Sequence, residues 1–180
     1  MLKVAIVGNI ASGKSTVEKI IEDKGFKVYD TDKIAHDILA NSSEVIEEFG
    51  TNNRKEIAKI VFSEPTRLKK LESIIHPLVK DELLNIFAKD DNIVFVSVPQ
   101  LFEAGFESLF DKIIYITADE NIRKERLIKR NFFTAEEAQN RINAQAEAGK
   151  KEKSDFVIEN NSTIKSLNEQ ITNILSILIR

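Results

Sequence analysis

The chain has 180 residues, which suits a single globular domain, and its composition is ordinary for one. It contains no cysteine and two histidines, which excludes disulfides, thiolate metal sites and a metal cage built from histidine. The 26 basic and 29 acidic residues give a net charge of −3, whereas proteins that bind nucleic acid usually carry a basic excess. We therefore expect no nucleic-acid partner.

The apolar runs of the chain are short. A run such as residues 93–96 falls far below the roughly 20 residues that a membrane helix needs. The first eight residues carry one basic side chain and lead directly into a functional motif, unlike a cleavable signal peptide. We expect no membrane partner and a location in the cytoplasm.

Short apolar runs rich in β-branched residues predict five buried strands, and helical patterns lie between them. This alternation indicates an α/β protein with a mostly parallel sheet. The predicted strands are Lys3–Val7, Phe26–Tyr29, Asn92–Val98, Lys112–Ile116 and Asp155–Ile158.

Between the first strand and the first helix, residues 8–15 read Gly-Asn-Ile-Ala-Ser-Gly-Lys-Ser and match the motif G-x-x-x-x-G-K-[ST] at every fixed position. In such a loop, consecutive backbone N–H groups and the helix N-terminus bind phosphate oxygens. Lys14 brings a positive charge to the β- and γ-phosphates, and Ser15 offers its hydroxyl to Mg²⁺. An ordinary strand-to-helix turn is the competing interpretation, and the surrounding strand and helix favour the phosphate loop.

A phosphate loop alone does not separate a kinase from a guanine-nucleotide switch. No aspartate is followed three positions later by glycine, and the chain contains no Asn-Lys pair. The sequence therefore argues against a switch GTPase.

From Asp32 to Asp91 the sequence shows no strand pattern, which is far longer than a minimal crossover. The predicted helices there cover Lys33–Ala40, Arg54–Phe62 and a stretch from Pro65 that is interrupted at Pro77. The interruption would put His76 at a helix corner, facing a substrate, although a packed or capped histidine is the alternative. These helices look like a substrate-binding subdomain.

Acidic residues follow the second and third strands, at the edge where α/β sheets bind ligands. Asp32 is our candidate to orient an acceptor proton or to hold the metal through water, while Asp30 is equally suited to cap the next helix. Glu103 follows the third strand and should reach the same edge. A solvated turn or loop is the competing interpretation for each of them.

Two S/T-x-x-E patterns, at Thr117–Glu120 and Thr134–Glu137, predict two more helices, the second ending at Gly149. Residues 121–153 hold nine Lys or Arg and five Glu. Guanidinium groups on such a hairpin suit closure over phosphates, and beside a phosphate loop we favour that role for Arg130 over a solvated basic face.

The hairpin carries two more features. Arg126 shares a helix face with Arg130, and Arg141 lies on the next helix. Phe132 and Phe133 could stack on a base, but a packing role fits them better. At the end of the chain, Ile164–Ile179 has the apolar spacing of an amphipathic helix that packs against the sheet.

Taken together, these motifs resemble the dephospho-CoA kinase family over nearly the whole chain. The matching segments are the phosphate loop with Ser15–Val17, then Asp30–His36, Leu71–Pro77, Val98–Glu103, Arg126–Arg130, Arg141–Gln145 and Asp155–Asn160. The resemblance implies an α/β P-loop NTPase fold with an adenylate-kinase-like, five-stranded parallel sheet of order 2-3-1-4-5 and helices on both faces. It also implies one domain, 1–180, with a helical acceptor-binding subdomain at 33–90 and a lid at 119–153.

The activity implied by the resemblance is the ATP-dependent phosphorylation of the ribose 3′-hydroxyl of dephospho-CoA, with Mg²⁺. This reaction gives coenzyme A and ADP and is the last step of coenzyme A synthesis. A related kinase for another small molecule or nucleoside monophosphate, and a non-catalytic nucleotide switch, are the alternatives. The partners would be ATP and dephospho-CoA, and the assembly a monomer or small homo-oligomer.

The resemblance also assigns residues. The catalytic residues would be Asp32, Lys14 and Arg130. The ATP-binding residues would be Gly8, Ala11, Ser12, Gly13, Lys14, Ser15, Thr16, Arg130 and Arg141. Substrate would contact Asp32, His76, Phe102 and Glu103, and Mg²⁺ would contact Ser15 directly and Asp32 through water.

The chain departs from the family pattern at several positions. The family usually has glycine where Asn9 and Ala11 stand, an aliphatic residue at Gln100 and aspartate at Asn131. A methyl group at Ala11 is compatible with the loop if its φ is negative, and Asn9 tolerates left-handed geometry better than most residues.

Overall fold

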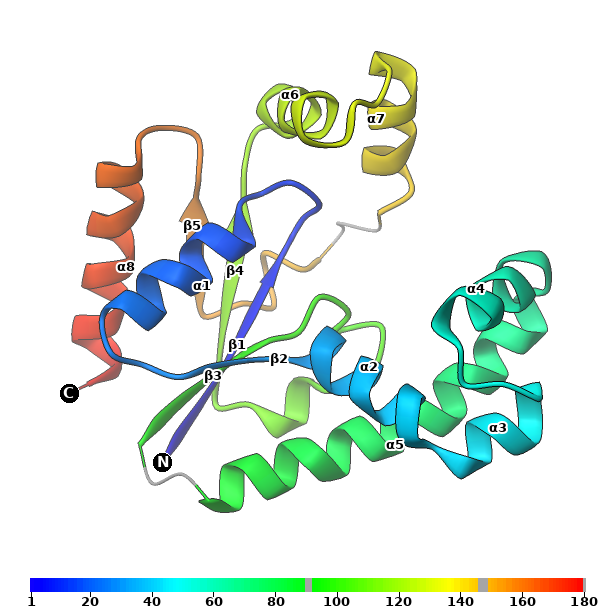
Figure 1. Ribbon diagram of the computed structural model, residues 1–180. Helices are drawn as coiled ribbons and strands as arrows, with labels where there is room; N and C mark the ends of the chain where they lie inside the picture. Colours follow the sequence, from blue (N-terminus) through cyan, green and yellow to red (C-terminus); the bar gives the residue numbers. More distant parts are fainter. Residues whose placement is uncertain (90–91, 146–148, 180) are drawn as a thin grey trace. The chain divides into compact units, whose positions relative to one another are not determined.

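The computed structural model describes residues 1–89, 92–145 and 149–179 (Figure 1). The chain divides into two compact units. The sheet unit comprises Met1–Tyr29 and Asn92–Arg180, and the helical unit comprises Asp30–Asp91. In the part of the chain that is described, no helix combines the length and the apolar character needed to cross a bilayer.

The sheet is parallel, and its strand order is β2-β3-β1-β4-β5, which confirms the predicted fold class and order. Its strands are β1 (Leu2–Gly8), β2 (Val28–Asp30), β3 (Ile93–Ser97), β4 (Lys112–Thr117) and β5 (Phe156–Glu159). β1 lies at the centre, with β3 on one side and β4 on the other. Because β1 is covered on both faces, Val4–Val7 form a continuous buried apolar run rather than an alternating one.

One face of the sheet packs against α1 (Lys14–Asp23) and α8 (Ile164–Leu178). The amphipathic pattern that predicted α8 is confirmed, since its apolar stripe is buried. The buried residues of this core include Val4, Ile6, Val17, Ile21, Phe95, Ile114, Ile116, Ile158, Leu167 and Ile171. Burial of apolar side chains therefore fixes both α1 and α8 against the sheet, and α1 begins directly after the loop that leaves β1.

After β3 come a short 3₁₀ helix, η1 (Glu107–Leu109), and then β4, followed by α6 (Glu120–Asn131) and α7 (Ala135–Asn143). α7 begins with the predicted capping box: Thr134 N–H donates to Glu137 (2.8 Å), and Glu137 N–H donates to the Thr134 hydroxyl (3.2 Å). The hydrogen bond from the Thr134 backbone lowers the pKa of Glu137, and the Thr134 hydroxyl acts in the same direction.

Two predictions about these helices are wrong. Thr117 caps no helix because it is the last residue of β4, and the N-cap of α6 is Asp119, whose carboxylate accepts a hydrogen bond from the Asn161 side chain. α7 ends at Asn143 rather than Gly149, because the Gln145 N–H bonds the Ile142 carbonyl in a tighter turn.

The helical unit contains α2 (Thr31–Asn41), α3 (Ser43–Phe49), α4 (Arg54–Ser63) and α5 (Pro65–Lys89). The first three are capped by the side chain directly before them, Asp30, Ser42 or Asn53. The sequence did not predict α3, whose seven residues are too few for a clear apolar period.

The predicted interruption at Pro77 is wrong, because α5 is one helix of 25 residues that runs through this proline without a break. Proline removes one backbone hydrogen bond, while burial of Ile74, Ile75, Val79 and Leu83 on both sides of it stabilises the continuous helix. His76 therefore lies within a helix, not at a corner.

Candidate active site

The loop between β1 and α1 needs both glycines of its motif. A Cβ on Gly8 would lie 2.8 Å from the Ile116 carbonyl and 2.8 Å from the Ser12 hydroxyl. Gly13 has a φ of 95°, and a Cβ there would lie 2.1 Å from the side-chain nitrogen of Asn160. Ser12 is fully buried, so its side chain is packed inside the protein.

The two departures from glycine have different explanations. Ala11 adopts a left-handed φ of 59°, so the condition of a negative φ is not met, and the strain costs about 1–2 kcal/mol. Asn9 is buried and accepts a hydrogen bond from the Tyr115 hydroxyl on β4. Among the described residues the non-glycine positions with positive φ are Ala11 and Phe132, so Asn9 serves as a polar contact rather than as a left-handed turn residue.

The ammonium group of Lys14 is already engaged. It donates to Glu18 (2.8 Å), one turn further along α1, and to the hydroxyl of Ser97 at the end of β3. The side chains of Lys14 and Glu18 are 22% and 17% exposed, so the pair is screened less than a surface ion pair. Sequence reasoning missed Glu18, although a lysine and a glutamate four residues apart on a helix are a readable signal.

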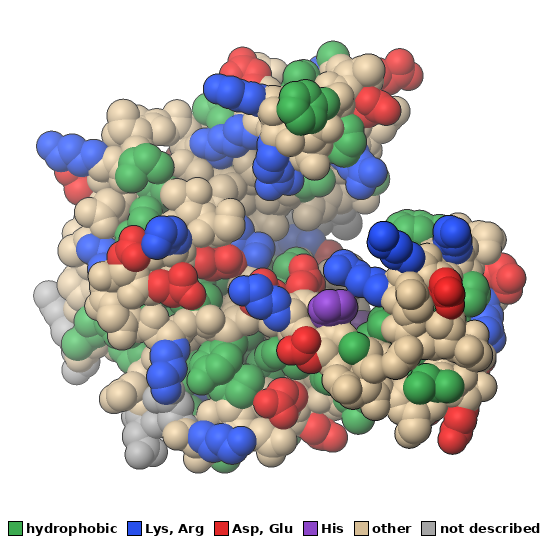
Figure 2. All heavy atoms as spheres, viewed as in Figure 1, with side chains coloured by type: hydrophobic (Ala, Val, Ile, Leu, Met, Phe, Trp, Pro, Cys, Tyr) green, Lys and Arg blue, Asp and Glu red, His purple; other side chains and the backbone are tan. Residues whose placement is uncertain are grey.

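A pocket of about 430 Å³ opens beside the loop, a volume within the usual range for small-molecule sites. Its lining residues are Ala11, Gly13, Ser15, Thr16, Arg126, Lys129, Arg130, Asn160, Ser162 and Ile164. The structure thus brings several of the predicted nucleotide residues together with Arg130. Lysine and arginine side chains gather around α6 and α7 in Figure 2, which favours an anionic ligand on this side.

Arg141 is not part of that lining. Its guanidinium lies 5.1 Å from the centre of the Phe133 ring, in a cation–π contact. Phe133 packs with Leu127, Ala138 and Ile142 in a small core between α6 and α7, as its packing interpretation predicts. Phe132 is 92% exposed and contributes nothing to this core.

The loop is attached to the α6–α7 hairpin. Ile10 and Ala11 pack against the same small core, and the Ile10 N–H donates to the side chain of Gln145 (2.6 Å). Gln145 belongs to the segment Arg141–Gln145 that resembles the kinase family, but the sequence alone did not indicate what it contacts.

The predicted acceptor residues lie in both units. In the sheet unit, Glu103 pairs with Lys150 (2.5 Å), and the ring centre of Phe102 lies 5.6 Å from the Lys153 ammonium. In the helical unit, Asp32 is exposed in the first turn of α2, after the expected cap Asp30, whose carboxylate accepts the Asp32 N–H (2.8 Å). His76 is half-buried within α5.

The donor groups near the loop suit magnesium. No cluster of three or more histidine, cysteine or acidic side chains that could hold a metal occurs in the described ranges. The pocket beside the loop instead offers the Ser15 hydroxyl. Magnesium binds through few protein oxygens together with substrate phosphates, so this hydroxyl fits it.

Known proteins share this architecture. A shikimate kinase from Bacteroides thetaiotaomicron superposes with a TM-score of 0.61 at 13% identity, covering 99% of both chains, which is a likeness of fold. A dephospho-CoA kinase from Campylobacter jejuni superposes with a TM-score of 0.75 at 28% identity, covering 98% of this chain and 96% of the other.

Sequence comparison is more specific. A dephospho-CoA kinase of Fusobacterium nucleatum is 38% identical over 185 residues, which cover 93% of this chain and 94% of the relative. The family model of the dephospho-CoA kinases matches residues 2–166. The structure has a phosphate loop, a cationic pocket beside it and a parallel sheet of order 2-3-1-4-5. The sequence resembles dephospho-CoA kinases along almost its full length, and the chain belongs to the dephospho-CoA kinase family.

Proposed function

We propose that this protein transfers the γ-phosphoryl group of ATP to the ribose 3′-hydroxyl of dephospho-CoA, forming coenzyme A and ADP. The observation that carries the proposal is the phosphate loop opening into a cationic pocket of about 430 Å³, in a chain of this family. Its curated relatives bear the name dephospho-CoA kinase. ATP, the phosphoryl donor of this reaction, is an anion whose charge and size suit this pocket.

On the donor side, backbone N–H groups of the loop and Thr16 would bind the phosphates of ATP. The Lys14 ammonium would exchange Glu18 for the β- and γ-phosphate oxygens, where a positive charge stabilises the transition state. Arg130, which lines the pocket, would neutralise the transferred group, and Arg141 would leave Phe133 to assist it.

Magnesium would be held by the Ser15 hydroxyl and the phosphates, with Asp32 acting through water. Bound there, Mg²⁺ supplies charge neutralisation across the β- and γ-phosphates. Ser97 stands at the end of β3, and its hydroxyl accepts a hydrogen bond from the Lys14 ammonium.

On the acceptor side, we assign Asp32 the role of accepting or orienting the proton of the 3′-hydroxyl. His76, Phe102 and Glu103 would bind the acceptor. Residues 33–90 would form the acceptor-binding region, and residues 119–153 would close over the phosphates and exclude water, which limits ATP hydrolysis.

A coupled assay tests the proposal. The protein is incubated with ATP, Mg²⁺ and dephospho-CoA, and ADP and coenzyme A are quantified separately. We expect stoichiometric formation of both, and loss of turnover in Lys14→Ala, with Lys19→Ala as the matched control because Lys19 pairs with Asp23 on the surface of the same helix.

A panel of nucleoside monophosphates and small alcohols checks acceptor choice. Faster ADP release with one of these acceptors than with dephospho-CoA would contradict the assignment. ATP binding without turnover of any acceptor would favour a nucleotide switch.

We also propose a cytoplasmic location, supported by the absence of cysteine from the sequence, which fits a reducing compartment. Cell fractionation with a tagged protein tests this. Sedimentation of the purified chain decides between a monomer and a small homo-oligomer.

A further inference from the structure

We propose that Arg126 and Asn160 are positioning residues that hold the peptide planes of the phosphate loop in their phosphate-binding orientation. We call this pair the carbonyl clamp. The inference rests on the proposed use of the loop to bind ATP, but not on the identity of the acceptor. It assigns Arg126 a task different from closure over phosphates, the role first considered for the basic hairpin.

The clamp consists of hydrogen bonds from side chains to backbone carbonyls. One terminal nitrogen of Arg126 donates to the carbonyls of Ala11 and Ser12, at 3.2 Å each, and the other donates to the carbonyl of Asn160 at 2.9 Å. The side chain of Asn160 donates to the same Ser12 carbonyl at 2.8 Å. Ser12 is therefore held by both members of the pair.

The geometry of the peptide bond transmits this hold to the phosphate side. In a trans peptide unit the C=O and N–H groups point in opposite directions. Because the Ser12 carbonyl points at Arg126 and Asn160, the Gly13 N–H of the same unit points away from them. Likewise, the Ala11 carbonyl faces Arg126 while the Ser12 N–H bonds the Asn9 carbonyl (3.0 Å) and closes the turn.

The clamp also accounts for two unusual backbone positions. Gly13 lies so close to Asn160 that a Cβ would be 2.1 Å from the side-chain nitrogen, so only glycine leaves room for the Asn160 side chain at this position. Ala11 has a left-handed φ of 59°, and its carbonyl is one of the bonded groups. Strained backbone persists where surrounding contacts fix it, and Arg126 supplies such a contact beside the packing of Ala11 against the small core between α6 and α7.

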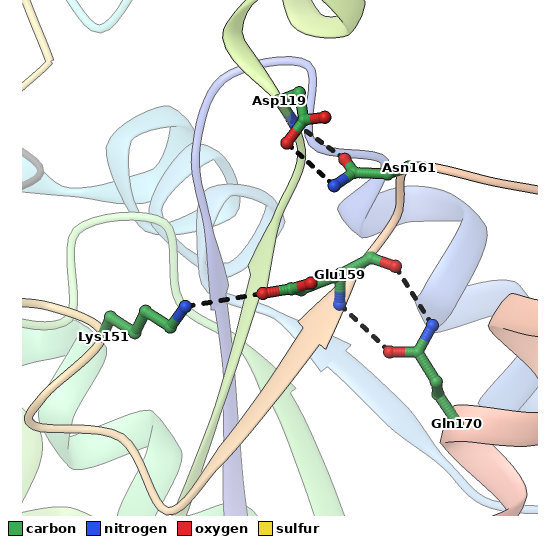
Figure 3. Close-up of polar contacts among 5 residues, drawn as sticks. All are labelled: Asp119, Lys151, Glu159, Asn161 and Gln170. Carbon is green, nitrogen blue, oxygen red and sulfur yellow. Dashed lines mark hydrogen bonds and ion pairs between the residues drawn. The ribbon is translucent and has the colours of Figure 1, made fainter.

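The two chain neighbours of Asn160, Glu159 and Asn161, are each held by side-chain hydrogen bonds (Figure 3). Before it, the backbone N–H and C=O of Glu159 bond the Gln170 side chain on α8, at 3.1 and 3.0 Å. After it, Asn161 exchanges hydrogen bonds with Asp119, at 2.8 Å each. The Asn160 N–H bonds the Thr117 carbonyl (2.8 Å), so the clamp is anchored to β4, α6 and α8.

The planar guanidinium is suited to this work. It presents several N–H donors in a fixed geometry, whereas a lysine ammonium is a compact charge that cannot reproduce bonds to three separated carbonyls. Substitution by lysine keeps the positive charge at the pocket and removes the geometry. It therefore separates positioning from direct neutralisation of phosphate.

The test compares Arg126→Lys, Arg126→Met and Asn160→Ala with the parent protein, and uses Lys124→Met on the same helix as the charge-matched control. ATP affinity is measured by calorimetry without acceptor, and the Gly13 amide is followed by ¹H–¹⁵N NMR and hydrogen exchange. We expect Arg126→Lys and Asn160→Ala each to weaken ATP binding about tenfold, through loss of charged or buried hydrogen bonds. The Gly13 amide should shift and exchange faster in both.

Further readouts distinguish the clamp from a merely structural contact. KM for ATP should rise more than kcat falls, while KM for the acceptor stays unchanged. The double variant Arg126→Lys/Asn160→Ala should lose less than the product of the single effects, since both act on the Ser12 carbonyl.

Unchanged ATP affinity in Arg126→Lys would overturn the proposal, and so would weakened affinity with an unaltered Gly13 amide. Because these measurements need no acceptor, they can support the clamp even if dephospho-CoA turns out not to be the substrate. If Arg126→Met does not fold, Asn160→Ala and Arg126→Lys carry the test.

Discussion

The phosphate loop is bonded by side chains that lie more than 100 positions away in the sequence, from Tyr115, Arg126, Gln145 and Asn160. In the helical unit, by contrast, α2, α3 and α4 are each capped by the residue directly before the helix. The loop therefore depends on the assembled sheet unit, whereas the helix starts of the helical unit depend on local chemistry. Substitutions around the loop should alter nucleotide binding, and most surface substitutions in the helical unit should alter little.

The largest effect is expected at an exception to this contrast. Asp32 is an exposed residue of the helical unit, and we assign it the proton of the acceptor. Asp32→Asn should lower kcat by about 10²–10⁴, the usual contribution of general acid–base catalysis, while ATP affinity and melting temperature change little. Steady-state kinetics with calorimetry measures this, and Asp37→Asn on the same helix is the control. A kcat within twofold of the parent would exclude Asp32 as the catalytic base.

Two glycines with similar backbone conformation give the next prediction. Gly13 and Gly25 have φ values of 95° and 90°, but a Cβ on Gly25 meets nothing within 4 Å. Gly25→Ala should cost about 1–2 kcal/mol from backbone strain alone. Gly13→Ala should cost more and should weaken ATP binding, because the methyl group collides with the Asn160 side chain. Urea unfolding and calorimetry compare the two, and equal losses of stability with intact binding would contradict the long-range view of the loop.

The Lys14–Glu18 pair leads to a smaller effect of opposite sign. Glu18→Gln removes the carboxylate that competes with phosphate for the Lys14 ammonium, so ATP affinity should increase about two- to fivefold, as for a partly screened ion pair. The Lys19–Asp23 pair has the same spacing on α1 but is exposed, and Asp23→Asn should leave ATP affinity unchanged. Weaker ATP binding in Glu18→Gln would mean that the carboxylate helps to hold the bound nucleotide.

The smallest effect concerns a contact between β4 and Asp155, the residue directly before β5. Burial tends to raise the pKa of Asp155, but hydrogen bonds from Lys112 and from the Ile113 N–H outweigh it, so the pKa lies below its ordinary value of 3.8. A lowered pKa stabilises the fold above pH 3.8, and that stability is lost as the pH falls through the folded value.

Asp155→Asn should therefore cost up to about 1 kcal/mol at pH 7 and less near pH 2, with no effect on ATP affinity at pH 7. Urea unfolding at both pH values tests it. A loss of stability that is the same at both would show that the charge of Asp155 is not involved.

Local patterns revealed much of the fold. The strands and α8 follow from the pattern of apolar residues. The loop at residues 8–15 could be predicted because the glycines, lysine and serine that define its motif all lie within the segment itself. The Thr134–Glu137 box was readable for the same reason. The similar spacing at Thr117 misled because β4 extends to that residue, and strand pairing prevailed over a local capping signal.

What the sequence could not reveal depended on distant partners. Nothing near Asn9 indicates the hydroxyl of Tyr115, and nothing near Arg126 indicates that its guanidinium bonds loop carbonyls. Pro77 suggested a break because the burial of its neighbours, which keeps α5 continuous, is a tertiary property.

The pairing of β1 bears on how the chain folds during synthesis. Leu2–Ile6 pair with Ile93–Ser97, so the whole helical unit, whose last helix ends at Lys89, is synthesised before this partner strand. At the usual pace of translation, about 5–20 residues per second, the N-terminal strand waits roughly 5–20 s for its first neighbour to be made. During that interval an apolar segment, Val4–Val7, has no sheet to join, so this stretch is where a chaperone would be expected to bind the nascent protein.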